Sequence, residues 1–427
     1  MDRTIQPEIQ TLKNFWILAP VRSTLPNGIP LTVINAGEQD VVRMDILFAG
    51  GRWQQSQKLQ ALFTNRMLRE GTTKYTAATI AEKLDYYGSW LELSSASEYA
   101  YITVYSLNKY LAKTLEIVES MIKEPLFPEK ELRTILDTNI QQYLVNTSKV
   151  DFLAHRSLLK SLYGEQHPCG KIVMEEDYHT ITPDVLRNFY EQHYHSGNCS
   201  IFLSGKVTED TIRRVTDTFG VPFGQHQLQM PKLSFPFAAV PEKRIFTERG
   251  DAMQSAVKMG CTTITREHPD YPKLRVLMTL FGGYFGSRLM SNIREEKGYT
   301  YGISAGIMFY PDSGMLLVST ETDNEYVEPL IQEVYHEIDR LHQEPVSMEE
   351  LTMVRNYMLG EMCRSYESPF SLSDAWIFIA TSGLTDDYFS HSLHAVNEIT
   401  PAEIQDLAQR YLCKETLKEV IAGKKLS

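Results

Sequence analysis

Apolar side chains recur at helical spacing in two long segments of the chain. The intervals alternate between four and three residues, which places each set on one face of a helix. The first set comprises Leu111, Leu115, Val118 and Ile122, and the second comprises Val327, Ile331, Val334, Ile338 and Leu341. Both segments end at a Glu-Pro pair, at residues 124–125 and 344–345, where proline stops a helix for steric reasons. The pattern predicts two long helices that each turn one face towards a core.

The sequence around these two predicted helices is also similar in the two halves of the chain. Strand-like runs lie at 41–51 and 254–264, helix-like runs at 57–69 and 271–281, and further strand-like text at 90–107 and 304–320. Because the order and spacing agree, we expect one α+β unit to occur twice. The predicted domains are residues 1–220 and 243–427, and a linker with four prolines and no clear periodicity joins them at 221–242.

The composition is that of an ordinary globular protein, and the net charge argues against one class of partner. Acidic residues number 54 and basic residues 42, for a net charge of −12 over 427 residues. This excess of acid argues against a nucleic-acid backbone as the main partner, since phosphate contacts need clustered Lys and Arg. The five cysteines lie far apart, which predicts neither a disulfide framework nor a thiolate zinc site. The first 16 residues hold no apolar core of signal-peptide length, and no run approaches the ~18 apolar residues of a membrane span. We therefore expect a cytoplasmic protein.

The segment QALFTNRMLREGT, residues 60–72, resembles the signature helix of the pitrilysin or insulinase zinc-peptidase family, in its processing-peptidase-like branch. In that family the helix carries His-x-x-Glu-His shortly before a Gly-Thr pair. Two histidines four residues apart share a helix face and can hold one zinc ion, while the Glu activates the bound water. Aligned on the Gly-Thr pair at 71–72, these positions are Leu62, Asn65 and Arg66 here.

None of these three side chains suits zinc chemistry. Leucine has no donor atom, asparagine cannot take a proton at neutral pH, and arginine stays cationic and repels a metal. The resemblance also implies a third zinc ligand, a Glu, from the helix after the first Glu-Pro stop. The corresponding window, residues 139–142, reads NIQQ and holds no carboxylate. We therefore expect no metal or other cofactor on this chain.

Two histidine pairs elsewhere offer other candidates for a metal site. His193 and His195 lie in a predicted loop before a strand, with one carboxylate close by, so that site would be incomplete. His391 and His394 share a predicted helix face with a glutamate one turn further on, and we interpret this face as solvated.

Residues 281–306, FGGYFGSRLMSNIREEKGYTYGISAG, resemble the second-domain motif of the same family. There, a glycine-rich loop precedes a helix, and an Arg and a Tyr seven positions apart point towards the peptide that is cut. Here those positions are Arg294 and Tyr301. In the family the pair hydrogen-bonds the substrate and helps to stabilise the oxyanion, a role that a guanidinium and a phenol suit.

The glycines of this segment, Gly282, Gly283 and Gly286, permit close backbone approach and positive φ. The resemblance implies that they touch the backbone of the bound peptide. A phosphate cradle is the alternative interpretation, but the order G-x-G-x-x-G and a Walker lysine are both absent.

The resemblance covers nearly the whole chain, because further stretches at 25–28, 162–171 and 182–207 also match in order. It implies an α+β fold of two homologous domains, each a mainly antiparallel sheet packed against helices, which together form half of a clamshell. The implied function is that of a non-zinc subunit in a heterodimeric metalloendopeptidase. Such a chain binds a peptide substrate, is inactive alone, and completes the site of a homologous partner that carries the zinc.

Two other functions remain open from the residues alone. The chain could be a non-enzymatic peptide-binding or scaffold homodimer of the same fold. It could also be a zinc-independent enzyme, although no nucleophile has a base near it in the sequence.

Overall fold

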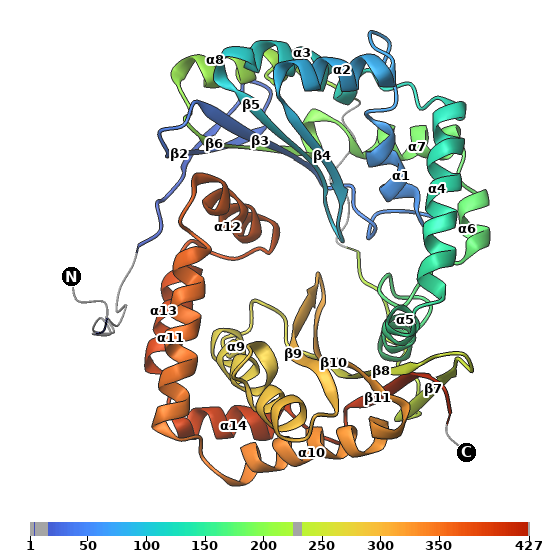
Figure 1. Ribbon diagram of the computed structural model, residues 1–427. Helices are drawn as coiled ribbons and strands as arrows, with labels where there is room; N and C mark the ends of the chain where they lie inside the picture. The colour runs from blue at the N-terminus through green and yellow to red at the C-terminus, as the bar shows by residue number, and fades with distance from the viewer. Residues whose placement is uncertain (1–3, 5–15, 225–232, 426–427) are drawn as a thin grey trace.

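Two β-sheets form the framework of the computed structural model, which describes residues 4, 16–224 and 233–425 (Figure 1). The other residues lie outside this description; they include most of the segment examined for a signal peptide and part of the predicted linker. The first sheet consists of β1 (Val21–Thr24), β2 (Pro30–Asn35), β3 (Val41–Phe48), β4 (Trp90–Ser95), β5 (Ala100–Leu107) and β6 (Cys199–Gly205). The second consists of β7 (Arg244–Glu248), β8 (Gln254–Thr263), β9 (Thr300–Tyr310), β10 (Ser313–Asp323) and β11 (Lys418–Gly423).

The two sheets repeat one topology. Their strand orders are β1-β2-β6-β3-β5-β4 and β7-β11-β8-β10-β9, so β2 to β6 find their counterparts in β7 to β11. In each sheet one pair is parallel, β2 with β6 and β7 with β11, and the pairs that continue from β6 or β11 to the β4 or β9 edge are antiparallel. The predicted duplication and the mixed α+β fold with two mainly antiparallel sheets are thereby confirmed. The domain limits at 220 and 243 stay a prediction.

Helices cover the sheets in a similar order in both halves. The first half has α1 (Gln60–Met67), α2 (Ala77–Tyr87), α3 (Leu111–Lys123), α4 (Glu129–Thr147), α5 (Val150–Tyr163), α6 (Glu175–His179), α7 (Pro183–His193) and α8 (Glu209–Phe219). The second has α9 (Tyr271–Met278), α10 (Val327–Gln343), α11 (Met348–Arg364), α12 (Pro369–Thr381), α13 (Tyr388–Glu398) and α14 (Pro401–Tyr411). The predicted stripes lie on α3 and α10, and all nine of their apolar side chains are buried. Within the described residues, no helix combines the length and apolar character that crossing a bilayer requires.

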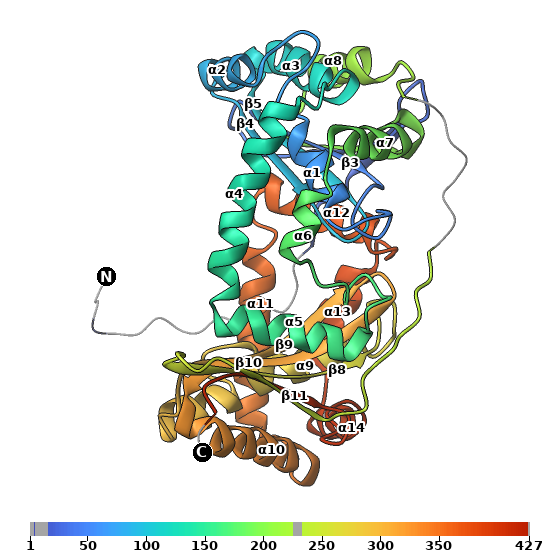
Figure 2. The same cartoon turned by 90° about the vertical axis from the view of Figure 1, so that its right-hand side faces the viewer.

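Each half contributes one helix to the sheet of the other half (Figures 1 and 2). Helix α5 packs on β8 and β11, where Leu158 and Leu162 join a buried cluster with Met315 and Val420. Helix α12 packs on β6 and β2, where its apolar face meets Ile34, Leu47 and Phe202. The two halves are therefore held together through exchanged helices as well as through the linker.

A charged side chain lies under each exchanged helix, at the fifth position of β3 and of β8. Asp45 is 1% exposed and binds the Arg43 guanidinium, Nη2 to Oδ1 at 2.9 Å, while the same nitrogen reaches Asp374 of α12 at 2.6 Å. Lys258 is also buried and pairs with Asp151 of α5. A hydroxyl on the neighbouring strand completes each site: Thr103 donates to Asp45, and Lys258 donates to Ser319. The repeat thus places a buried ion pair at both contacts between the halves.

Candidate functional site

Helix α1 carries the replaced zinc positions, and its side chains are built into the core. Asn65 is fully buried; its Nδ2 donates to the Tyr101 carbonyl at 3.3 Å, and its Oδ1 has no hydrogen-bond partner. Leu62 packs partly buried against the core of the first half. Arg66 lies one turn further on, on the same face as Leu62, and reaches across to α4. The three positions therefore serve packing and a contact between helices.

The contact of Arg66 brings α1 and α4 together at the position expected for the third ligand. Its Nη1 donates to Asn139 Oδ1 at 2.6 Å, and the Asn139 amide donates back to the carbonyl of Ile135 at 2.8 Å. The window at 139–142 therefore does face α1, as the resemblance implies. A cationic guanidinium, two amides and an aliphatic side chain cannot hold zinc, so these residues do not fit the metal. Elsewhere in the described chain, no three His, Cys, Asp or Glu side chains group closely enough to bind a metal ion.

The histidine pairs are used in other ways. His193 is the last residue of α7 and does not lie in a loop; the next residue, Tyr194, caps the helix by donating its N–H to the Tyr190 carbonyl. It is fully buried, and burial lowers the pKa of its imidazole to about 4, although the nearby Ala49 carbonyl acts in the opposite direction. His391 is exposed and pairs with Asp387 one turn before it at 3.6 Å.

The structure brings Arg294 and Tyr301 side by side on the second half. Arg294 belongs to a π-helical turn, Met290–Glu296, and Gly298 with φ 68° reverses the chain before β9 begins. The Arg294 Cζ lies 5.7 Å from the ring centre of Tyr301 and 4.6 Å from that of Phe285. Tyr301 is 93% exposed, and among the described carboxylates none forms an ion pair with Arg294. A half-buried guanidinium and an exposed phenol therefore lie side by side.

Two anchors fix the turn that carries Arg294. The Asn292 amide donates to Glu337 at 2.8 Å and to Glu333 at 3.0 Å on α10. The Tyr299 N–H donates to the carbonyl of Ile293, a fully buried residue, at 3.0 Å. Phe285 is 62% exposed and was not anticipated as part of this group. The sequence signal for it was only its place in the glycine-rich segment.

The three glycines differ in what they contribute. Gly282 is buried, and a Cβ added there would lie 2.5 Å from the Cβ of Ala305 on β9. Gly283 and Gly286 are exposed, beside the Arg294 turn. None of the three has a positive φ. Of the two properties that glycine permits, the close approach of the segment to β9 is the one that requires a small side chain at Gly282. Contact with peptide backbone stays a prediction for all three.

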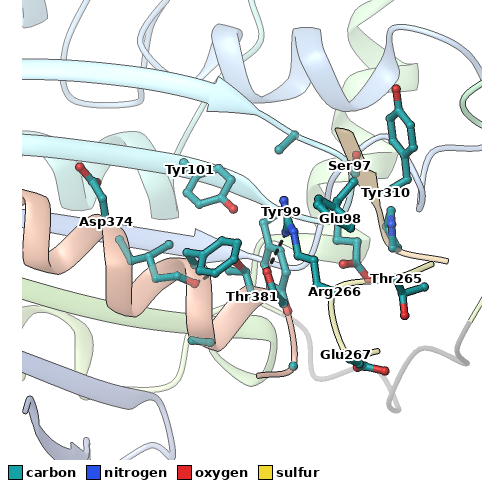
Figure 3. A pocket seen from close by; sticks show the side chains of 18 residues that line it. Ser97, Glu98, Tyr99, Tyr101, Thr265, Arg266, Glu267, Tyr310, Asp374 and Thr381 are labelled. Carbon is teal, nitrogen blue, oxygen red and sulfur yellow. Dashed lines mark hydrogen bonds between the residues drawn. The ribbon is translucent and has the colours of Figure 1, made fainter. Parts of the chain in front are cut away.

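A cavity of about 600 Å³ lies between the two halves (Figure 3). Its walls come from the β4–β5 turn, the segment after β8, the β9–β10 turn and α12. Arg266 lies between the rings of Phe309 and Phe378, at 4.8 and 4.7 Å, and donates to Ser382 Oγ at 2.8 Å. Sequence reasoning missed this cavity because its residues come from four distant segments.

Comparison with known proteins finds matches to two models of one peptidase family. Residues 34–175 match a model described as insulinase (peptidase family M16), and residues 180–358 match one described as peptidase M16 inactive domain. An uncharacterised zinc protease of Bacillus subtilis is 23% identical over 354 residues, 81% of this chain and 84% of that protein. A non-peptidase homologue of Helicobacter pylori is 22% identical over 358 residues, 81% of this chain and 80% of its own length.

Solved structures share the whole fold. A peptidase M16 inactive domain from Pseudomonas fluorescens superposes with a TM-score of 0.86 at 22% identity, over 96% of this chain and 99% of that one. A protease from Helicobacter pylori gives a TM-score of 0.87 at 14% identity, over 96% of this chain and all of its own. At such identities the likeness concerns the fold.

Proposed function

Because the chain belongs to the insulinase family (peptidase family M16), as a member with an inactive domain over residues 180–358, we propose that it is the non-zinc subunit of a two-chain metalloendopeptidase. One observation carries the proposal. The zinc positions on α1 and α4 hold residues that cannot bind metal, whereas a half-buried Arg294 lies beside the exposed Tyr301 on the second half.

The proposed work of this chain is to bind and polarise a peptide. Edge strands offer unpaired main-chain groups, so an extended peptide can add to a sheet by main-chain hydrogen bonds. Strands β4 and β9 lie at such edges, and Tyr301 is the second residue of β9. From there the Arg294 guanidinium and the Tyr301 phenol would donate to a carbonyl oxygen of the peptide and stabilise the negative charge that develops on it. Gly283 and Gly286 would leave room for the peptide backbone.

The partner follows from what this chain lacks. We propose a homologous, zinc-bearing peptidase subunit, with the two chains enclosing the peptide substrate and the metal held by the partner alone. The cytoplasm remains the expected location. In this arrangement the chain is inactive by itself and contributes Arg294 and Tyr301 to a site that is completed between subunits.

Co-purification from the source cell, followed by metal analysis and peptide hydrolysis, tests the proposal. We expect a zinc-bearing homologue in the complex, no stoichiometric zinc on this chain alone, and peptide cleavage by the pair. Arg294→Ala should lower kcat/KM of the pair about 100-fold, the usual effect of losing one oxyanion donor, without changing its zinc content. Arg213→Ala, an exposed arginine of α8, is the matched control. Zinc-dependent cleavage by the chain alone, or full activity of the Arg294→Ala pair, would overturn the proposal.

A second function is a non-enzymatic peptide-binding or scaffold homodimer. It is favoured by the relative from Helicobacter pylori that is described as a non-peptidase homologue. Sedimentation of the chain from its own cell separates the two functions. A homodimer that binds peptides without any zinc-bearing subunit would support the second, whereas a stable heterodimer that cleaves them supports the first.

A further inference from the structure

A second cavity, of about 620 Å³, lies beside the replaced zinc positions. It is lined by α4, α5, the loop that precedes α1 and the segment that leads into α6, and Figure 2 shows α4, α5 and α6 together on the side that faces the viewer. Asn139, which accepts the hydrogen bond from Arg66, is also part of its wall. The cavity is therefore adjacent to the place where the family holds a metal cation.

The charge of this cavity is opposite to that of the protein. Four cationic side chains line it, Arg52, Lys58, Arg156 and Lys171, against a single carboxylate, Asp177. That carboxylate is already paired with Lys58 at 2.9 Å. In a chain of net charge −12, this local excess of positive charge marks the cavity as a site that attracts anions.

Arg156 is the cationic side chain of the cavity that its neighbours hold in place. Its Nη2 donates to the Val173 carbonyl at 2.6 Å, and its guanidinium lies over the rings of Phe152 and Tyr143, at 5.1 and 5.5 Å. No described carboxylate forms an ion pair with it. Its Nη1 also donates to Tyr143 Oη at 3.5 Å, and its Nη2 donates to Met174 Sδ at 3.3 Å. A half-buried guanidinium presents five N–H bonds in a fixed fork, so donors remain for an acidic group beside these contacts.

The rest of the wall combines amide and hydroxyl side chains with an aromatic part. Trp53 is 4% exposed and Tyr178 is 8% exposed, and Phe235 closes the wall from the segment between the halves. The volume falls within the roughly 300–1,000 Å³ of small-molecule sites, which are usually apolar with a few placed polar groups. The cavity thus combines a cationic end with room for a ring system.

We propose that this cavity binds a small organic anion. Its acidic head would meet Arg156 and Lys171, and its flat apolar body would pack against the aromatic wall. The proposed anion site lies next to the part of α1 and α4 where the family resemblance implies a zinc cation. The proposal does not depend on Arg294 and Tyr301, which lie on the other half.

Two matched fluorescent probes test this proposal on the full chain. 1-Anilinonaphthalene-8-sulfonate carries an aromatic body and an anionic head, and N-phenyl-1-naphthylamine has the same body without the charge. We expect one saturable sulfonate site, weakened at least about tenfold by Arg156→Gln, the effect of losing a hydrogen bond to a charged group. Lys171→Gln should weaken it about threefold, because Lys171 is exposed and its charge is screened. Binding of the uncharged probe should stay unchanged in both variants.

The controls keep the proposal falsifiable. Arg213→Gln, an exposed arginine on α8, should bind the sulfonate as the unaltered chain does. If Arg156→Gln folds poorly, Lys171→Gln decides, since its exposed side chain is not needed for packing. Sulfonate binding that is weak and multiple, or equal in the unaltered chain and in Lys171→Gln, would overturn the proposal, as would equal loss of both probes.

Discussion

Removing the Arg43 side chain should weaken the contact between the halves more than any surface ion pair does. Arg43 is 7% exposed and gives Asp45 two hydrogen bonds, from Nε at 3.0 Å and Nη2 at 2.9 Å, while it also holds Asp374 and the Phe370 carbonyl of α12. Among the described residues, Arg43→Met would leave the Asp45 carboxylate with two hydroxyl partners, those of Thr103 and Ser373. Breaking a buried pair in this way costs about 3–5 kcal/mol, because it leaves a charge buried without compensation.

The pH dependence of this loss identifies its cause. Burial already raises the pKa of the Asp45 carboxyl above its usual value, although Arg43 opposes the shift. Without Arg43 this pKa rises further, so the folded variant binds a proton that the unfolded chain does not. Stability linked to a raised pKa is complete below the unfolded value and is lost as pH rises through the folded value. The cost of Arg43→Met should therefore be smaller at pH 5 than at pH 7.

Urea unfolding followed by circular dichroism measures both effects. Arg43→Met with Asp45→Asn should recover most of the loss at pH 7, since the buried charge is gone. Arg22→Met is the matched control: Arg22 also pairs with an aspartate of the other half, Asp386, at 2.7 Å, but both side chains are about half exposed. It should cost less than about 1 kcal/mol. Equal costs for Arg43→Met and Arg22→Met, or a double variant as unstable as Arg43→Met, would refute the reasoning.

Three further predictions concern stability and are measured by the same unfolding assay. Asp151→Asn should lower the free energy of unfolding more than Lys258→Met does. The first change leaves the buried Lys258 ammonium without its carboxylate, whereas the second leaves the half-exposed Asp151 carboxylate in contact with water. The reverse order would contradict a buried ion pair. The folded pKa of His193, about 4, lies below that of the unfolded chain, so the unfolded state binds the proton first as the pH falls. The free energy of unfolding should therefore decrease by about 3 kcal/mol between pH ~6.5 and 4. His193→Gln should remove most of this pH dependence. Gly282→Ala should cost about 1–3 kcal/mol through its 2.5 Å approach to β9, whereas Gly302→Ala, with open space around it, should cost little; equal losses would remove the steric account.

Local patterns predicted the elements of this fold, but not the contacts between its halves. The stripes on α3 and α10 mark buried helix faces, and Gly88, with a left-handed φ of 61°, ends α2. These features depend on neighbours within a few residues. The exchange of α5 and α12 depends on surfaces about 90 residues or more away along the chain, and no local pattern shows which sheet either helix covers.

The residues of the candidate site also differ in how far the sequence could predict them. The resemblance paired Arg294 with Tyr301, and in the structure one short turn and the start of β9 join them. Arg66 and Asn139 could be placed together only through the resemblance, since they lie on separate helices. Phe285 and the two cavities were beyond sequence reasoning, because side chains from distant segments form them.

The exchanged helices also decide how the chain responds to a cut. If a protease opened the segment between the halves, each fragment would keep the helix that covers the other fragment's sheet. Separation would then expose two apolar sheet faces and the charges of Asp45 and Lys258 at once. We therefore expect the nicked chain to persist as a tight complex of two fragments, which migrates as one species in native gels and falls apart only in denaturant.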